Sequence, residues 1–326
     1  MKLRICIIGN GVFANKVHYP CLASFSDVEI IGIFAFNEAR LRQTASQYHI
    51  PEERVYALSA KTDYRQVLLK LKPDAVYAIG QPEQLFDVWM WRLENRFPLF
   101  IEKPMGITWH QANMLAWLAD QNQCITQVCF QRSCSPVLQK MKAECLKKGA
   151  ITHAVVEFSK YDPRPMFGAR DRMLDDFIHC IDTGRWICGG EIIKIESHCR
   201  RIAGPDINWI GATLYFDNGS VCYAIGNWNS GRRIFKATLH APGICAEVET
   251  EKEAYLYAEG DYDGIRYSSR AIAGSDAFFI FAGFQRKHRE FVDSVLSGNE
   301  KTSSPFRDAL KTMKVCESIL AQTILV

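Results

Sequence analysis

The sequence predicts an α/β protein with two domains: a doubly wound parallel sheet, followed by an α+β domain with a large, mostly antiparallel open sheet. Three observations support this. A glycine-rich turn directly follows a short apolar run near the N-terminus. Short apolar runs then alternate with amphipathic segments over roughly the first 125 residues, a pattern typical of βαβ units. Beyond about residue 150 the chain shows successive alternating runs of the kind that form antiparallel strands.

The first domain is predicted to span residues 1–125. Its buried strands are short apolar runs bounded by polar or turn residues, and its helices repeat apolar residues every three or four positions. The predicted strands are 3–8, 28–34, 74–79 and 97–101, and the predicted helices are 13–25, 38–48, 64–71 and 86–95.

The second domain is predicted to span residues 126–326. Asp217-Asn218-Gly219-Ser220 forms a strong turn signal, because Asn and Gly tolerate the positive φ of tight hairpins. The closing helices of this domain can pack back on the first domain. The predicted strands are 154–159, 191–198, 209–216, 220–228 and 235–241, with alternation continuing over 245–257, and the closing helices are 278–296 and 305–320.

Composition excludes several classes of protein. The net charge of +3 gives no general reason to expect a nucleic acid or an anionic membrane as partner. No apolar run approaches the roughly 20 residues of a membrane-spanning helix. The twelve cysteines are scattered without any CxxC pair, which favours reduced, buried thiols in a cytoplasmic protein and no metal site.

The motif Gly9-Asn10-Gly11-Val12-Phe13-Ala14 has the form GxGxxA and lies between a predicted strand and a predicted helix. In a Rossmann dinucleotide site the first glycine permits the tight turn and the second lets the backbone approach a pyrophosphate. The alanine keeps the helix close to the sheet, and the helix N-terminus stabilises the phosphate charge. The sequence therefore predicts an NAD(P)-binding Rossmann domain in which all six residues, Gly9 to Ala14, contact the cofactor.

Residues at the ends of later strands extend this cofactor site. The second strand is followed by Ala35-Phe36-Asn37, without the acidic residue that binds the adenosine ribose in NAD-specific proteins. Arg40 or Arg42 can approach a 2′-phosphate from the next helix, which favours NADP slightly over NAD. Ligands of open α/β sheets lie at the carboxyl ends of the strands, so the predicted cofactor contacts also include Gly80, Gln81, Pro82, Glu102 and Lys103.

Two further motifs resemble those of the Gfo/Idh/MocA oxidoreductases. Phe100-Ile101-Glu102-Lys103-Pro104 ends a strand about 90 residues after the glycine motif, and Leu174–Asp182 reads LDDFIHCID, similar to the family pattern D-x-x-x-H-x-x-D. The residues of the second motif, together with Phe130-Gln131-Arg132, most resemble those of the MviM-type branch. The resemblance covers essentially the whole chain. It implies that Lys103, Asp175 and His179 are catalytic and that the open sheet packs against another subunit, as a homo-oligomer (dimer or tetramer).

These residue types suit proton transfer beside a nicotinamide. Asp175, His179 and Asp182 project from one face of a helix, and a carboxylate can fix the tautomer of the imidazole. Lys103 can polarise a substrate hydroxyl or carbonyl. The chain departs from the family near the expected substrate, with Leu85-Phe86 in place of a histidine and Phe177 in place of a glycine. The candidate residues for lining the substrate cleft are Arg132, Tyr161, Arg164, Arg170, Arg172, Asp176, Trp228 and Arg232.

The sequence thus predicts an NAD(P)-dependent dehydrogenase or reductase. We expect hydride transfer between the nicotinamide and a hydroxyl or carbonyl carbon of a sugar, cyclitol or related small molecule. Two alternatives stay open: reduction of a C=N or C=C bond on the same fold, and a non-catalytic regulator that senses NAD(P).

Overall fold

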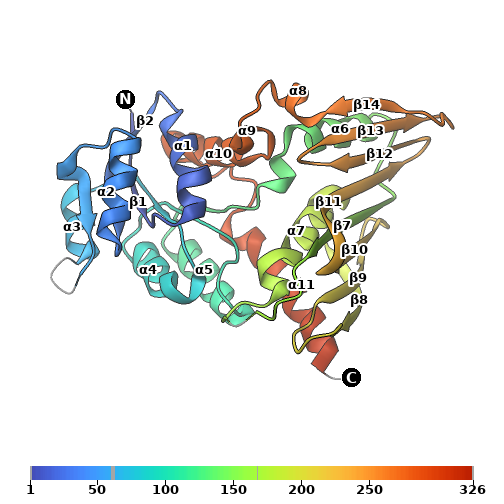
Figure 1. Cartoon of the computed structure of the whole chain (residues 1–326), viewed down its shortest axis with the longest axis horizontal. Helices are drawn as coiled ribbons and strands as arrows, with labels where there is room; N and C mark the ends of the chain where they lie inside the picture. Colours follow the sequence, from blue (N-terminus) through green and yellow to red (C-terminus); the bar gives the residue numbers. More distant parts are fainter. Residues whose placement is uncertain (1, 60–62, 167, 325–326) are drawn as a thin grey trace. The chain divides into compact units, whose positions relative to one another are not determined.

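The computed structural model describes residues 2–59, 63–166 and 168–324, with only the backbone described at residue 324. Two compact units make up the chain (Figure 1). The first unit contains Met1–Gly106, His110–Cys129 and Phe284–Leu310, and the second contains Ile107–Trp109, Phe130–Gly283 and Lys311–Val326.

The first unit is built on a parallel sheet. Among the described residues six strands follow the order β3-β2-β1-β4-β5-β6, and each neighbouring pair is parallel. The order reverses between β1 and β4, so the carboxyl ends of these two strands flank the usual ligand position of a doubly wound sheet. The strands are β1 (Leu3–Ile8), β2 (Val28–Ala35), β3 (Val55–Ala57), β4 (Ala75–Ala78), β5 (Leu99–Ile101) and β6 (Thr126–Val128).

Helices and short helical turns connect these strands. Burial of both faces of the sheet explains the uninterrupted apolar runs, since Ile5, Ile7 and Val76 are all fully inaccessible to solvent. The elements are the π-helical η1 (Ala14–His18), α1 (Tyr19–Ala23), α2 (Glu38–Gln47), the 3₁₀ turn η2 (Glu52–Arg54), α3 (Tyr64–Leu71), α4 (Pro82–Glu94), α5 (Trp109–Gln121) and α10 (Phe284–Ser297).

The second unit is built on a larger sheet. Within the described part of the chain its eight strands follow the order β14-β13-β12-β11-β7-β10-β9-β8. Only β7 and β10 pair in parallel among these neighbours, and every other pair is antiparallel. The strands are β7 (His153–Tyr161), β8 (Ile192–Arg200), β9 (Trp209–Phe216), β10 (Val221–Asn227), β11 (Asn229–Ala241), β12 (Ile244–Glu249), β13 (Glu253–Ala258) and β14 (Ile265–Ser268).

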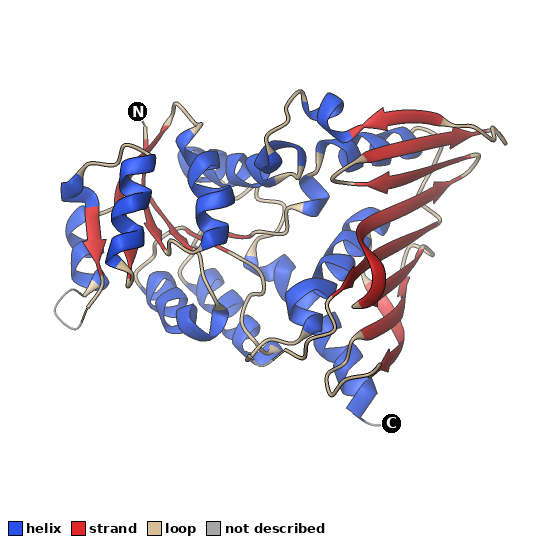
Figure 2. Ribbon diagram, viewed as in Figure 1, coloured by secondary structure: helices blue, strands red, loops and turns tan. Residues whose placement is uncertain are grey.

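Helices α6 and α7 lie against one face of this larger sheet (Figure 2). Burial alternates along β9, where Ile210, Ala212 and Leu214 are buried and the residues between them are partly exposed. This period of two is expected of a sheet with one packed face and one open face. The remaining helical elements are η3 (Arg132–Cys134), α6 (Pro136–Leu146), η4 (Met173–Phe177), α7 (Ile178–Cys188), α8 (Ser269–Ala273), α9 (Phe278–Phe281) and α11 (Phe306–Ile324).

The predicted fold class is confirmed, and most element bounds differ from the predicted ones by a few residues. The helix expected over 278–296 is broken into α9 and α10 at Gly283, where φ is +95° and an added Cβ would lie 2.3 Å from the carbonyl oxygen of Gln131. The alternation over 245–257 is found in two strands, β12 and β13, joined by a turn. No described helix has both the length and the apolar composition needed to cross a membrane.

Candidate active site

The glycine turn after β1 is shaped by contacts that leave no room for a side chain at its first residue. Gly9 has φ of +109°, its N–H donates to the carbonyl of Phe34, and an added Cβ would lie 1.9 Å from the carbonyl oxygen of Ile79. At Gly11 the added Cβ would meet no described atom within 4 Å. The turn therefore presents an open stretch of backbone at the point where a pyrophosphate would approach, as the GxGxxA motif predicts.

Side chains on neighbouring elements hold this turn in place. The amide of Asn15 donates to the carbonyls of Asn10 and Gly11, at 3.0 and 3.2 Å. The hydroxyl of Tyr19 donates to the carbonyl of Gly9, and the hydroxyl of Thr44 donates to Asn15 Oδ1. Ala14 is buried, whereas Val12 and Phe13 are exposed. The backbone of the loop is thus pre-organised before any ligand binds.

The end of β2 presents uncharged residues, as expected. Ala35 is buried, Phe36 is 82% exposed, and the Asn37 side chain accepts a hydrogen bond from the N–H of Arg40 at the start of α2. Arg42 is already paired with Glu38 at 2.8 Å and with Glu52. Of the two arginines considered for a 2′-phosphate, Arg40 is therefore the better candidate.

The carboxyl ends of β4 and β5 carry the other predicted cofactor residues. Gly80 follows β4, and Gln81 and Pro82 begin α4. Glu102 follows β5 and is 9% exposed, and its Oε2 accepts a hydrogen bond of 3.2 Å from the main-chain N–H of Lys103. The Lys103–Pro104 peptide bond is cis. The first unit therefore brings the glycine turn, Gly80 and the Glu102–Lys103 pair to one edge of its sheet.

In the second unit the acid and the histidine of the LDDFIHCID motif lie on consecutive helical segments. Asp175 belongs to η4 and His179 to α7, which follows without a break. Asp171 accepts a hydrogen bond from the N–H of Leu174, and burial raises the pKa of the Asp171 carboxyl. Arg170 Nη1 lies 3.1 Å from Asp175 Oδ1. His179 is 5% exposed and meets Phe130 edge to face.

Arg172 holds loops together. Its guanidinium donates to Asp206 Oδ2 at 2.8 Å and to the carbonyls of Asp162 and Arg164, and its side chain is 1% exposed. A buried guanidinium with these partners has little capacity left for a ligand. The structure thus gives Arg172 a loop-anchoring role, while Arg164 and Tyr161 are exposed, at 91% of the side chain and 70% of the residue respectively.

Asp176 and Trp228 contact each other directly. The indole N–H of Trp228 donates to Asp176 Oδ2 at 2.9 Å, and Lys160 Nζ lies 2.6 Å from the same oxygen. Arg132 is buried over Phe235, with its guanidinium carbon 3.9 Å from the ring centroid, and it reaches Glu251 at 3.4 Å. These contacts tie the helix that carries Asp175 to β7 and to the end of β10.

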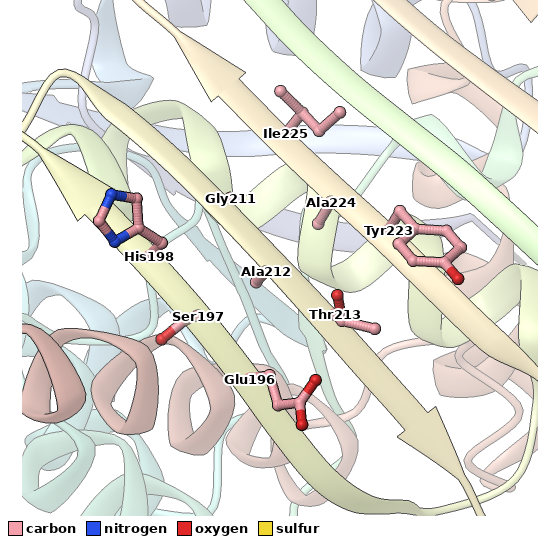
Figure 3. Close-up of a pocket in the computed structure, with 9 residues that line it drawn as sticks. All are labelled: Glu196, Ser197, His198, Gly211, Ala212, Thr213, Tyr223, Ala224 and Ile225. Atoms are coloured by element: carbon pink, nitrogen blue, oxygen red, sulfur yellow. The ribbon is translucent and has the colours of Figure 1, made fainter.

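A separate shallow groove of about 370 Å³ lies on the open face of the larger sheet (Figure 3). Figure 3 shows Glu196 and His198 from β8, Thr213 from β9, and Tyr223 and Ile225 from β10 around it. None of the predicted catalytic residues lines this groove.

The described residues contain no cluster of three or more His, Cys, Asp or Glu side chains able to hold a metal ion. All twelve cysteines, which lie in the described part of the chain, are free thiols, and ten are buried. Burial raises the pKa of Cys6 to about 12 and that of Cys145 to about 11, so these thiols stay protonated. They behave as small apolar side chains.

Sequence reasoning missed several residues that shape these sites. Lys160 and Asp206 complete the networks around Asp176 and Arg172, yet both lie in ordinary-looking polar stretches. His288 on α10 is fully buried within the first unit. The position of His288 on the apolar side of an amphipathic helix could have indicated its burial, but this pattern alone does not indicate a functional role.

Comparisons with known proteins agree with this architecture. Residues 3–130 match the GFO_IDH_MocA model, described as an oxidoreductase family with an NAD-binding Rossmann fold. The Salmonella typhimurium protein YceM, whose name describes it as an oxidoreductase, is 23% identical over 238 residues, which cover 73% of this chain and 69% of that protein.

Two solved structures show the same fold over nearly the full length. A Gfo/Idh/MocA family oxidoreductase from Vibrio cholerae gives a TM-score of 0.85 at 19% identity and covers all of both chains. Levoglucosan dehydrogenase, in complex with NADH and levoglucosan, gives a TM-score of 0.83 at 16% identity and covers 99% of this chain and 98% of that one. The chain is therefore an oxidoreductase whose residues 3–130 match a family model with an NAD-binding Rossmann fold, and its overall fold is that of a solved Gfo/Idh/MocA family structure.

Proposed function

We propose that this protein is an NAD(P)-dependent dehydrogenase that transfers a hydride between the cofactor and a hydroxyl or carbonyl carbon of a sugar, cyclitol or related small molecule. The observation that carries the proposal is the position of Lys103. It follows the carboxyl end of β5, on the sheet edge that also holds the glycine turn. The resemblance to levoglucosan dehydrogenase, which binds a sugar derivative, supports the substrate class.

The glycine turn fits a dinucleotide, because Gly11 leaves its backbone accessible and Gly9 permits the required conformation. We propose that Gly9–Ala14 hold the pyrophosphate, that Ala35–Asn37 and Arg40 meet the adenosine end, and that Gly80–Pro82 and Glu102 complete the site. When bound, the nicotinamide supplies the hydride acceptor or donor.

The proton steps fall to residues of this chain. In the oxidation direction the hydroxyl O–H bond breaks and its proton passes to His179, while the carbon loses hydrogen with its electron pair as hydride. Lys103, as an ammonium, stabilises negative charge that develops on the substrate oxygen. Asp175 orients His179 and stabilises its imidazolium form. We also propose that the chain belongs to the MviM-type branch, because the sequences of Leu174–His179 and Phe130–Arg132 resemble that branch.

The direct experiment is a substrate survey. Purified protein is incubated with NAD⁺ or NADP⁺ and, separately, glucose, myo-inositol, levoglucosan and UDP-N-acetylglucosamine, and reduced cofactor is followed at 340 nm. We expect saturable reduction with at least one of these hydroxyl compounds. Absence of turnover with all of them, in both cofactors, would contradict the substrate class.

The cofactor preference follows from the end of β2. Because no acid there repels a 2′-phosphate and Arg40 lies at the start of α2, we expect NADPH to bind more tightly than NADH. Titration of both reduced nucleotides against protein fluorescence measures this. Arg40→Ala should reduce or remove the difference, with Arg42→Ala as the matched control because Arg42 is paired with Glu38 and Glu52. Tighter binding of NADH to the native chain would reverse the assignment.

We further propose that the open face of the larger sheet forms a homo-oligomer, a dimer or tetramer. Tyr223 is 45% exposed and lies in the groove of Figure 3, beside Thr213 and Ile225. Sedimentation velocity at micromolar concentration should show an oligomer, and Tyr223→Glu should shift it toward monomer by burying a charge. Lys70→Glu, on exposed α3 of the first unit, should leave the sedimentation unchanged. A monomeric native chain would contradict this assignment.

A further inference from the structure

A polar chain of three side chains runs through the core of the first unit. Nδ1 of His18 lies 3.0 Å from Nε2 of His288, and Nε2 of His18 lies 3.0 Å from Oε1 of Glu102. Both histidines are completely buried. The far end of the chain is Oε2 of Glu102, which accepts a hydrogen bond from the main-chain N–H of Lys103. Residues 270 positions apart in sequence are thus connected to the lysine of the proposed reaction.

Aromatic rings fix the planes of both imidazoles. His288 stacks on Phe100, with centroids 4.6 Å apart and 10° between the planes, and on Tyr77 at 5.4 Å. His18 meets Phe13 and Phe100 edge to face. Because neither ring can turn without displacing these neighbours, the nitrogen that each imidazole presents to the chain is set by packing.

The packing determines which nitrogens carry hydrogen. Burial and the neighbouring His18 lower the pKa of His288 well below its ordinary value, so this imidazole is neutral and has one N–H. Its Nδ1 has no hydrogen-bond partner among the described residues, so the hydrogen belongs on Nε2, which faces His18. His18 Nδ1 accepts this hydrogen, so the hydrogen of His18 itself belongs on Nε2, which lies at ion-pair distance from Glu102 Oε1, 3.0 Å, but outside hydrogen-bond geometry.

The hydrogens of both imidazoles therefore lie on the side that faces Glu102. The carboxylate accepts a hydrogen bond from the main chain of Lys103 and lies at ion-pair distance from His18 Nε2, while His18 Nδ1 accepts a hydrogen bond from His288. The groups around the chain add no charge of their own, because burial raises the pKa values of the Tyr77 hydroxyl and the Cys21 thiol. Arg289, one position after His288, is paired with Asp27 and Asp293. A directional chain of this kind stabilises a buried carboxylate better than a single contact does.

We propose that His288, His18 and Glu102 form a relay that positions the main chain of Lys103, with His18 and His288 acting as positioning residues that never touch the substrate. The proposal rests on the proposed role of Lys103 in the reaction. Oε2 of Glu102 accepts from the main chain of Lys103 and Oε1 lies 3.0 Å from His18 Nε2, so replacing one oxygen with an amide nitrogen must alter one of these two contacts. Because the histidines are coupled, the change reaches His288, which makes no direct contact with Glu102.

Two readouts test the relay without any substrate. In Glu102→Gln, the imidazole ¹⁵N signals of His288 should change, as its hydrogen is displaced or shared. In His288→Phe, which keeps the stacked ring but removes the donor, the amide hydrogen of Lys103 should exchange with solvent at least about tenfold faster. The matched control is Asp27→Asn, which removes a carboxylate that contacts α10 through Arg289 at 2.9 Å, outside the relay. That variant should change neither readout.

The relay is overturned if the imidazole ¹⁵N signals of His288 are unchanged in Glu102→Gln. It is also overturned if the amide hydrogen of Lys103 exchanges at the native rate in His288→Phe. Both variants should first show the circular dichroism spectrum of the native protein, so that an unfolded variant is recognised. The His288→Phe variant should also bind NADPH as tightly as the native protein. Because neither readout needs turnover, failure of the relay is distinct from failure of the proposed reaction. An active Lys103 variant would overturn the reaction scheme and leave the relay measurements intact.

Discussion

Replacing Lys103 with methionine is expected to lower kcat about 10²- to 10⁴-fold, the usual contribution of a positioned proton-transfer or charge-stabilising group. Methionine keeps most of the unbranched stem of lysine and removes only the ammonium, so packing at the end of β5 should persist. Nucleotide affinity should stay within about twofold, because the interaction lost is made in the transition state. Steady-state kinetics on the substrate identified by the survey, with NADPH titration beside it, measures both effects.

A matched surface variant separates this effect from general loss of positive charge. Lys70→Met removes an exposed lysine of α3 and should change neither kcat nor nucleotide binding. His179→Gln should also reduce kcat, and the Lys103/His179 double variant should lose less than the product of the single losses if both groups act in one step. Unchanged turnover in Lys103→Met would remove that residue from the reaction.

The second large effect is expected from substitutions at the two glycines of the cofactor turn. One substitution should lower stability and the other should lower nucleotide affinity. Gly9→Ala should lower the free energy of unfolding by at least about 2 kcal/mol, because φ of +109° is strained for alanine. Its methyl group would also lie 1.9 Å from the carbonyl oxygen of Ile79, so β1 and β4 must separate. Chemical denaturation of the nucleotide-free protein measures this loss.

Gly11→Ala should leave stability nearly unchanged, because its methyl group would meet no described atom within 4 Å. That same open space is where the pyrophosphate should approach, so nucleotide affinity should fall about tenfold or more, equivalent to about 1.4 kcal/mol. The pair serves as its own control. Full NADPH affinity in a folded Gly11→Ala variant would show that the cofactor does not bind across this turn.

The first unit was the more predictable part of the chain because its signals are local. The apolar run Leu3–Ile8 and the helix Tyr64–Leu71 were predicted with the bounds that the structure has. By contrast, the short strands β3 and β6 were not predicted, since three residues carry too little periodicity to be recognised. The break at Gly283 could not be predicted from nearby residues. Glycine is needed there because the carbonyl of Gln131, which is distant in sequence, lies where a side chain would be.

The arginines near the second motif show why local reading could not assign roles. Arg172 and Arg164 are both predicted from the sequence as candidate substrate residues. In the structure the guanidinium of Arg172 is buried on Asp206 and loop carbonyls, whereas Arg164 extends into solvent. The difference depends on which loops fold over each side chain, and residue type alone does not reveal it.

The sequence by itself determined the dinucleotide fold, because the GxGxxA turn, the apolar runs and the EKP motif act through neighbouring residues. Only the tertiary structure decided which polar groups share a buried environment. His18, Glu102 and His288 come from η1, the residue after β5 and helix α10, and they meet only after the sheet is assembled. Hydrogen bonds between such residues depend on distances of about 3 Å, which the order of residues along a chain does not encode.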